Sequence, residues 1–105
     1  MNFGLSRPII AQLGAVFARY PDIFKVVLFG SRAKGSYRNG SDIDLAVFAP
    51  TMSAQIFDKL WNEVEDLPIV FKVDCLHFES LSNYVLKKKI EAEGVLFYDA
   101  VKSTM

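Results

Sequence analysis

The stretch FGSRAKGSYRNGSDIDLAVF, residues 29–48, joins a glycine-serine turn to two aspartates on a predicted strand. Successive side chains of a strand point to opposite faces, so Asp42 and Asp44 share one face and the apolar residues between and after them share the other. Paired carboxylates repel each other and are costly to desolvate unless cations hold them. The pattern therefore predicts a metal site on a strand that packs against a core.

The size and composition of the chain exclude several classes of protein. Its 105 residues are expected to form a single domain over 1–105, and its formal net charge of zero gives no positive field to hold duplex nucleic acid. The single cysteine, Cys75, excludes an internal disulfide. With no secretory signal pattern and no apolar run of about 20 residues, we expect a cytoplasmic chain without a membrane segment. Part of the heavy phenylalanine load is expected at a partner interface.

Hydrophobic periodicity alternates between helical and strand patterns along the chain. The predicted helices cover 6–20, 32–37, 51–67 and 80–93, and the predicted strands cover 25–29, 42–49, 70–77 and 95–98. This order predicts an α/β (α+β) fold, a small mixed β-sheet with helices packed on it.

Several residues mark the expected ends and contacts of these helices. Thr51 or Ser53 is predicted to begin the third helix, and Ser80 to cap the fourth. Gly94 is the expected stop of that fourth helix. Gly14, inside the first helix, costs up to about 1 kcal/mol relative to alanine and so indicates close packing there.

A third carboxylate, Asp74, lies on the predicted strand 70–77. If the strands that carry the aspartates are neighbours, the three carboxylates converge at one edge of the sheet. Magnesium prefers oxygen ligands, and two such ions about 4 Å apart can activate a hydroxyl and stabilise a leaving oxygen at phosphorus. The alternative is a set of solvent-facing aspartates at strand ends. On the same strand, Cys75 is expected in the core, and His77 is expected to be a packed residue rather than a ligand.

The glycine-serine turn has features of a phosphate site. Gly30 lets the backbone approach a ligand closely, and Ser31 adds a hydroxyl donor at a helix start that favours phosphate. Arg32, Lys34 and Arg38 put three cations within reach of a triphosphate held there. An ordinary turn with a solvated loop is the alternative interpretation of these residues.

These motifs together resemble the DNA polymerase β nucleotidyltransferase superfamily. The resemblance consists of Gly30-Ser31, ten further residues, then Asp42-x-Asp44, with Asp74 on a later strand. The short length is similar to that of the minimal nucleotidyltransferase (MNT) branch, the antitoxin partners of HEPN-type toxins. The resemblance covers nearly the whole chain and implies a polymerase β palm-like fold.

The resemblance also implies a role for each motif residue. Gly30 and Ser31 would hold the triphosphate of an incoming nucleotide. Asp42 and Asp44 would bridge two Mg²⁺ ions, and Asp74 would complete the catalytic metal and help deprotonate the acceptor hydroxyl.

The remaining implications concern the loop cations and a partner. Arg32 and Lys34 complete the nucleotide-binding set, although Lys34 stands where many members have arginine. Relatives with known acceptors carry a further helical domain, which these 105 residues lack. A helical HEPN-type protein is therefore expected to supply that wall or to be the acceptor.

Three hypotheses follow for function. The first is a Mg²⁺-dependent nucleotidyltransferase that moves a nucleoside monophosphate, AMP from ATP, to a hydroxyl of a HEPN-type partner and releases pyrophosphate. The second is a non-catalytic, nucleotide-binding antitoxin that acts by direct contact. The third is a free-standing enzyme that modifies a small molecule such as an aminoglycoside. Sequence leaves open the base, the acceptor, and whether the chain forms homo- or hetero-oligomers.

Overall fold

A computed structural model describes residues 3–38 and 40–103 of the chain. Its centre is a four-stranded sheet in the order β3-β2-β1-β4. The strands are β1 Lys25–Phe29, β2 Ile43–Phe48, β3 Val73–His77 and β4 Val95–Asp99. Strand β1 pairs antiparallel with β2 and β4, while β3 lies parallel to β2. The sheet is therefore mixed, as predicted.

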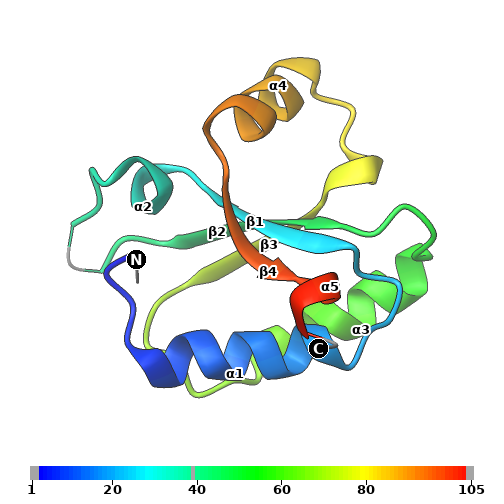
Figure 1. The fold of residues 1–105 in the computed structure, drawn as a ribbon, viewed down its shortest axis with the longest axis horizontal. Helices are drawn as coiled ribbons and strands as arrows, with labels where there is room; N and C mark the ends of the chain where they lie inside the picture. Colours follow the sequence, from blue (N-terminus) through cyan, green and yellow to red (C-terminus); the bar gives the residue numbers. More distant parts are fainter. Residues whose placement is uncertain (1–2, 39, 104–105) are drawn as a thin grey trace.

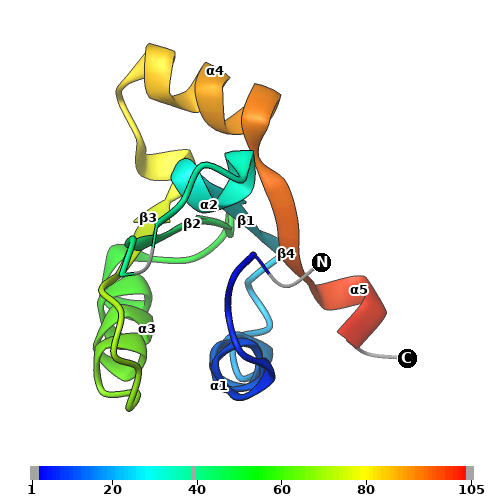
Figure 2. The ribbon, with the colours of Figure 1, turned by 90° about the vertical axis from the view of Figure 1, so that its left-hand side faces the viewer.

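Helices lie on both sides of the sheet (Figure 1). They are α1 Arg7–Ala18, α2 Ser31–Lys34, α3 Ala54–Glu65, α4 Tyr84–Glu93 and α5 Ala100–Ser103, with a short 3-10 helix η1 at Phe78–Ser80. Helices α1 and α3 cover one face of the sheet, whereas α2 and α4 lie on the other side (Figure 2). No helix in the described part of the chain has the length and apolar character needed to cross a membrane.

The face of the sheet that meets α1 and α3 forms the main core. Its buried side chains include Leu13, Val16, Phe17, Val26, Leu28, Ile43, Leu45, Val47, Leu60, Val64 and Cys75. The burial of Ile43, Leu45 and Val47 confirms that the apolar residues of β2 share one face. Cys75 is in the core as expected, and its burial, with a smaller effect from the charge of Asp74, raises the pKa of the thiol to about 12.

The opposite face carries a smaller apolar cluster. Ile90 of α4 packs there with Val27 of β1 and Ala46 of β2. Gly94, which follows α4, has an extended backbone, and a Cβ at this position would collide with the side chain of Val27. The predicted helix stop is thus in the right place, but the glycine is required by close packing of α4 on the sheet.

The helix caps and the start of β3 correct some of the sequence predictions. Ser53 caps α3 by accepting a backbone N–H at 3.2 Å. Ser80 does not cap α4 because it lies in η1, and Asn83 caps the helix instead by accepting an N–H at 3.0 Å.

Strand β3 begins at Val73, where its pairing with β2 begins, and Val70, predicted to be in the strand, is 90% exposed. Gly14 was expected at a close contact, but a Cβ there would meet nothing within 4 Å.

Leu45 is fully buried in β2, and Leu45→Ala is expected to lower the free energy of unfolding by about 2–5 kcal/mol because it leaves a cavity. Leu96→Ala is the matched control on edge strand β4, where Leu96 is 44% exposed; its cost is expected to be about 1 kcal/mol or less. Urea unfolding followed by circular dichroism measures both values. Equal losses would contradict the assignment of this face as the main core.

Candidate active site

The turn at Gly30 brings the backbone against an aspartate. Gly30 has φ 79° and ψ −156°, a region that residues other than glycine rarely occupy. A Cβ on Gly30 would lie 2.7 Å from Oδ2 of Asp44. Ser31 begins α2 directly after this turn, at the end of β1 (Figure 1). The glycine-serine turn and the β2 carboxylate therefore meet at one end of the sheet.

Strand pairing places two of the predicted carboxylates next to each other. Asp44 is in register with Phe29 on β1 and with Asp74 on β3. Residues opposite each other on paired strands point to the same face, so both aspartates lie on the face away from the main core. Asp42 is exposed and directly precedes β2.

The charges of the two other carboxylates act on Asp44. Burial raises the pKa of Asp44 above its ordinary value, and the negative charges of Asp74 and Asp42 raise it further. Lys72 acts in the opposite direction, and its Nζ lies 3.9 Å from Oδ2 of Asp74. A concentration of negative charge of this kind is relieved by a divalent cation.

The chemistry of these groups fits magnesium, because carboxylate oxygens are hard ligands. Within the described residues, however, no three His, Cys, Asp or Glu side chains are gathered closely enough to form a finished ligand set. Strand pairing places Asp44 beside Asp74, whereas the interaction of Asp42 is an electrostatic one with Asp44. Metal binding by these three residues stays a prediction.

Lys34, predicted to bind nucleotide phosphate, extends from α2 toward α4. Its Nζ lies 3.4 Å from Oε1 of Glu93, and both side chains are partly exposed. An exposed ion pair of this kind is worth about 1 kcal/mol or less. A phosphate group could therefore take the place of Glu93 at small cost.

Arg32 lies differently from what the sequence led us to expect. The sequence predicts a nucleotide-binding cation at this position, but the residue is only 3% exposed. Its guanidinium donates hydrogen bonds to the backbone carbonyls of Phe3 and Ser41. The buried group thus serves the protein's own backbone, and Lys34 is the more accessible cation of the turn.

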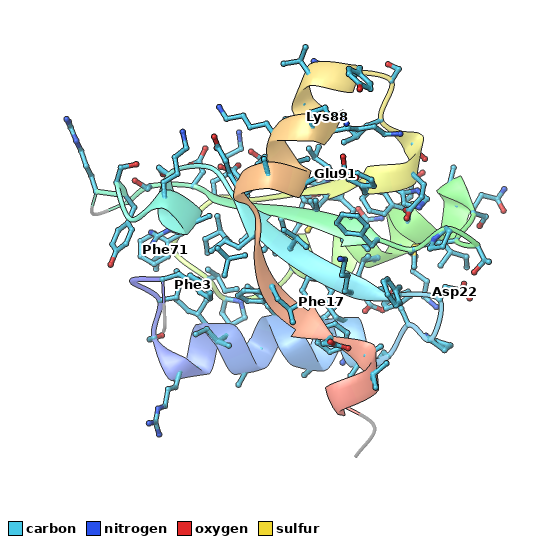
Figure 3. All side chains as sticks on the ribbon, turned by 45° about the horizontal axis from the view of Figure 1, so that its top comes forward. Phe3, Phe17, Asp22, Phe71, Lys88 and Glu91 are labelled. Carbon is cyan, nitrogen blue, oxygen red and sulfur yellow. The ribbon has the colours of Figure 1, made fainter. Side chains whose placement is uncertain are left out.

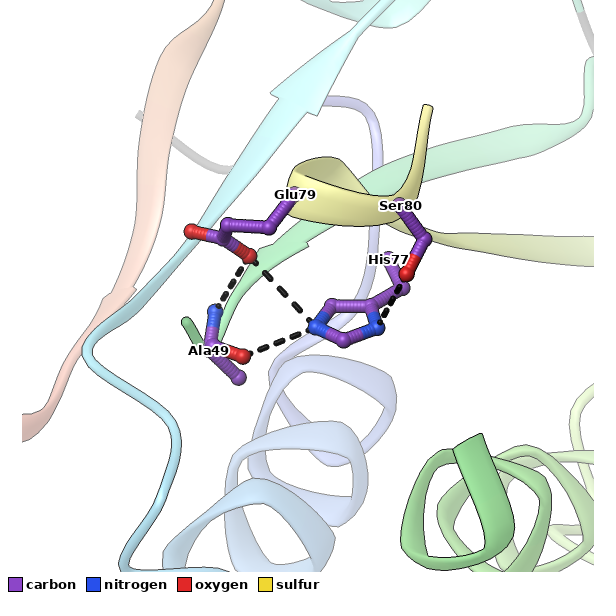
Figure 4. A network of polar contacts seen from close by, with 4 residues as sticks. All are labelled: Ala49, His77, Glu79 and Ser80. Carbon is purple, nitrogen blue, oxygen red and sulfur yellow. Dashed lines mark hydrogen bonds and ion pairs between the residues drawn. The ribbon is translucent and has the colours of Figure 1, made fainter. Parts of the chain in front are cut away.

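His77 belongs to a polar network beyond the carboxylates (Figure 4). Its Nε2 lies 2.8 Å from the carbonyl oxygen of Ala49, and its Nδ1 lies 3.0 Å from Oγ of Ser80. The ring also stacks on Phe57, with centroids 5.3 Å apart. Glu79 accepts the N–H of Ala49 at 2.9 Å. As expected, His77 is a packed residue, and it ties η1 to the chain after β2.

Two further charged residues, Lys72 and Glu93, are neighbours of the site that its sequence motifs do not include. Lys72 is two residues before Asp74, so strand alternation could have placed both side chains on one face. Glu93 gave no comparable signal, because its contact with Lys34 depends on how α4 packs on the sheet. Both residues add to the charge pattern around the turn.

Comparison with known proteins identifies the family. The family described as polymerase beta, nucleotidyltransferase matches residues 11–103, and the chain belongs to it. A search of curated proteins finds no significant match. The predicted family and mixed-sheet nucleotidyltransferase fold are therefore confirmed.

Solved structures agree with this assignment. A toxin–antitoxin structure with AMP-PNP has a TM-score of 0.68 and 25% identity, covering 95% of this chain and 85% of that chain. A mutant of the toxin–antitoxin MntA-HpeT has a TM-score of 0.66 and 23% identity, covering 95% of this chain and 84% of that chain. A candidate nucleotidyltransferase from Sulfolobus solfataricus has a TM-score of 0.55 and 22% identity, covering 94% of each chain. The toxin–antitoxin structures are consistent with the minimal branch of the family.

Gly30→Ala is expected to lower the free energy of unfolding by about 1–3 kcal/mol because alanine is strained at this φ and ψ. The new Cβ would also press on the carboxylate of Asp44. Gly14→Ala is the matched control in α1, where the added methyl group meets nothing and helix propensity favours alanine by up to about 1 kcal/mol. Urea unfolding distinguishes them, and a loss of stability in both variants would contradict the special geometry of Gly30.

The raised pKa of Asp44 also predicts a pH dependence of stability in chelator. The folded state keeps the proton of the Asp44 carboxyl group to higher pH than the unfolded chain does. The protonated group therefore contributes stability that is fully present below the ordinary pKa of 3.8 and is lost as pH rises through the raised pKa. Asp44→Asn is expected to remove that loss, so its advantage over wild type should grow across this window. Asp58→Asn on α3 is the control, and thermal unfolding at a series of pH values measures the difference. An advantage that does not change with pH would contradict the raised pKa of Asp44.

Proposed function

We propose that this chain is a Mg²⁺-dependent nucleotidyltransferase that moves AMP from ATP to a hydroxyl of a helical HEPN-type partner and releases pyrophosphate. Membership of the nucleotidyltransferase family supports a transferase. The observation that carries the proposal is the register of Asp44 with Asp74, directly beside the Gly30 turn. Carboxylates and a phosphate-accepting turn are the groups that phosphoryl transfer requires.

In this proposal the carboxylates and the glycine-serine turn have different tasks. Asp42, Asp44 and Asp74 would hold two Mg²⁺ ions, which supply charge neutralisation for the phosphates when bound. Gly30 and Ser31 would hold the triphosphate by their backbone N–H groups and the serine hydroxyl.

The transfer itself forms one bond and breaks one bond. The acceptor oxygen bonds to the α-phosphorus of ATP, while the bond from that phosphorus to the oxygen bridging to the β-phosphorus breaks. Pyrophosphate leaves with the bonding electron pair. Asp74 would take the proton of the acceptor hydroxyl. The ammonium group of Lys34 would leave the carboxylate of Glu93 and bind a phosphate oxygen instead.

Two observations support a protein partner. Two similar structures are each described as a toxin–antitoxin, one of them with AMP-PNP. Leu96 on the edge strand β4 is 44% exposed, and Phe24, which directly precedes β1, is 56% exposed. Exposed apolar side chains of this kind are suited to a protein contact. We place this protein and its partner in the cytoplasm, in keeping with the single, buried cysteine.

Asp44→Asn is expected to lower transfer of label from α-³²P-ATP to the partner by at least about a hundredfold, because the amide no longer supplies the negative charge that would hold the Mg²⁺ ions. Asp58→Asn, exposed on α3 away from the site, is the matched control and should transfer normally. Circular dichroism checks that both variants fold. Equal labelling by Asp44→Asn and wild type would rule out the enzyme assignment.

A second candidate function is a non-catalytic antitoxin that binds nucleotide and neutralises its partner by contact. One observation favours this function: among the described residues, no three His, Cys, Asp or Glu side chains lie close enough together to bind a metal ion. In a co-expression growth assay, the contact mechanism requires Asp44→Asn to protect cells as well as wild type does. Loss of protection with retained partner binding favours the transferase.

A further inference from the structure

The guanidinium of Arg32 binds two backbone segments that are far apart in the sequence. Its Nε and Nη2 both donate to the carbonyl oxygen of Ser41, at 3.2 and 2.9 Å, and its Nη1 donates to the carbonyl oxygen of Phe3 at 3.0 Å. A fork of two donors on one carbonyl fixes that peptide more firmly than a single hydrogen bond would. Arg32 thus joins α2 to the loop before β2 and to the start of the described chain.

Aromatic rings enclose the same guanidinium. Its Cζ lies 4.7 Å from the ring centroid of Phe71 and 5.2 Å from that of Tyr37. Phe71 and Phe3 lie at the same end of the molecule (Figure 3). Cation–π contacts gain strength when water is excluded, as it is around a residue that is 3% exposed. Phe71 leads into β3, so this contact also connects Arg32 to the strand that carries Asp74.

Ser41, the residue that Arg32 binds, directly precedes Asp42. Its hydroxyl accepts the N–H of Arg38 at 2.8 Å, and its own N–H donates to the carbonyl oxygen of Arg38 at 3.0 Å. With the guanidinium on its carbonyl, all three polar groups of Ser41 are engaged. Asp42 itself is exposed and outside the strand, so the position of its backbone depends on this anchored neighbour.

We propose that Arg32 is a positioning residue of the site: through Ser41 it fixes Asp42, and through Phe71 it holds the turn against the segment that leads to Asp74. For Arg32 to reach a phosphate, its guanidinium would have to give up three hydrogen bonds and two ring contacts. Lys34 would give up a single exposed ion pair. The nucleotide is therefore left to the turn and its exposed cations, Lys34 and Arg38, and Arg32 acts only through the residues it holds.

The test separates positioning from nucleotide contact, and its kinetic part rests on the proposed function. Arg32→Lys keeps a positive charge but loses the fork that holds the Ser41 carbonyl. We expect the half-saturating concentration of Mn²⁺, measured by electron paramagnetic resonance without nucleotide, to rise about tenfold or more, as loss of an outer-shell partner does. With the partner present, kcat should fall while KM for ATP stays within about twofold. Arg19→Lys, at a surface pair with Glu63, is the matched control and should change neither.

Two results would overturn the proposal. One is wild-type Mn²⁺ affinity in folded Arg32→Lys, and the other is a raised KM for ATP with unchanged kcat, which means that the guanidinium contacts the nucleotide. If Arg32→Lys does not fold, Phe71→Leu replaces it, because leucine keeps apolar volume but removes the ring face. Phe71→Leu should shift Mn²⁺ binding in the same direction by about threefold, in line with one lost cation–π contact; no shift overturns the proposal. If Arg32→Lys weakens Mn²⁺ binding but the wild-type protein transfers no AMP to the partner, only the proposed function is overturned.

Discussion

The alternation of side chains along β2 is the constraint on which the core and the candidate site both depend. Ile43 and Leu45 are buried on the face that meets α1 and α3, so the side chain between them, Asp44, must point to the other face. A slip of one residue in register would bury Asp44 and expose the apolar residues. Burying an unpaired carboxylate costs several kcal/mol, and the exposed leucine would lose its own burial. The packing of one face therefore determines the chemistry of the other.

The same constraint explains how the fold tolerates like charges at one place. Asp44 and Asp74 are adjacent because β2 and β3 are parallel and in register, and burial together with the repulsion from Asp74 raises the pKa of Asp44. Nearby Lys72 offsets part of this repulsion. The remaining repulsion lowers the free energy of unfolding, and the packing of the main core on the other face of the same strands compensates for this loss. Sites that concentrate charge commonly reduce stability in this way, and a cation or nucleotide that binds only the folded state increases the stability again.

The sequence predicted the local features because each depends on near neighbours. The alternation of β2 and the need for glycine at Gly30 follow from residues only a few positions apart. The position of Asp74 beside Asp44 depends on strand order, which local patterns leave open. For Arg32 the residue type suits a phosphate as well as a backbone carbonyl, and its contacts with the rings of Tyr37 and Phe71 depend on the tertiary fold.

The two faces of the sheet also differ in how completely helices cover them. On the second face α4 packs over Val27 and Ala46, and η1 lies near the far end of β2, whereas Asp44 and Asp74 keep partial exposure to solvent. Water around carboxylates weakens their electrostatic effect, and phosphoryl transfer gains when the reacting groups are enclosed. On the proposed function, a partner that covers this face would enclose the carboxylates as it presents its hydroxyl. Binding of the partner and completion of the site would then be a single event.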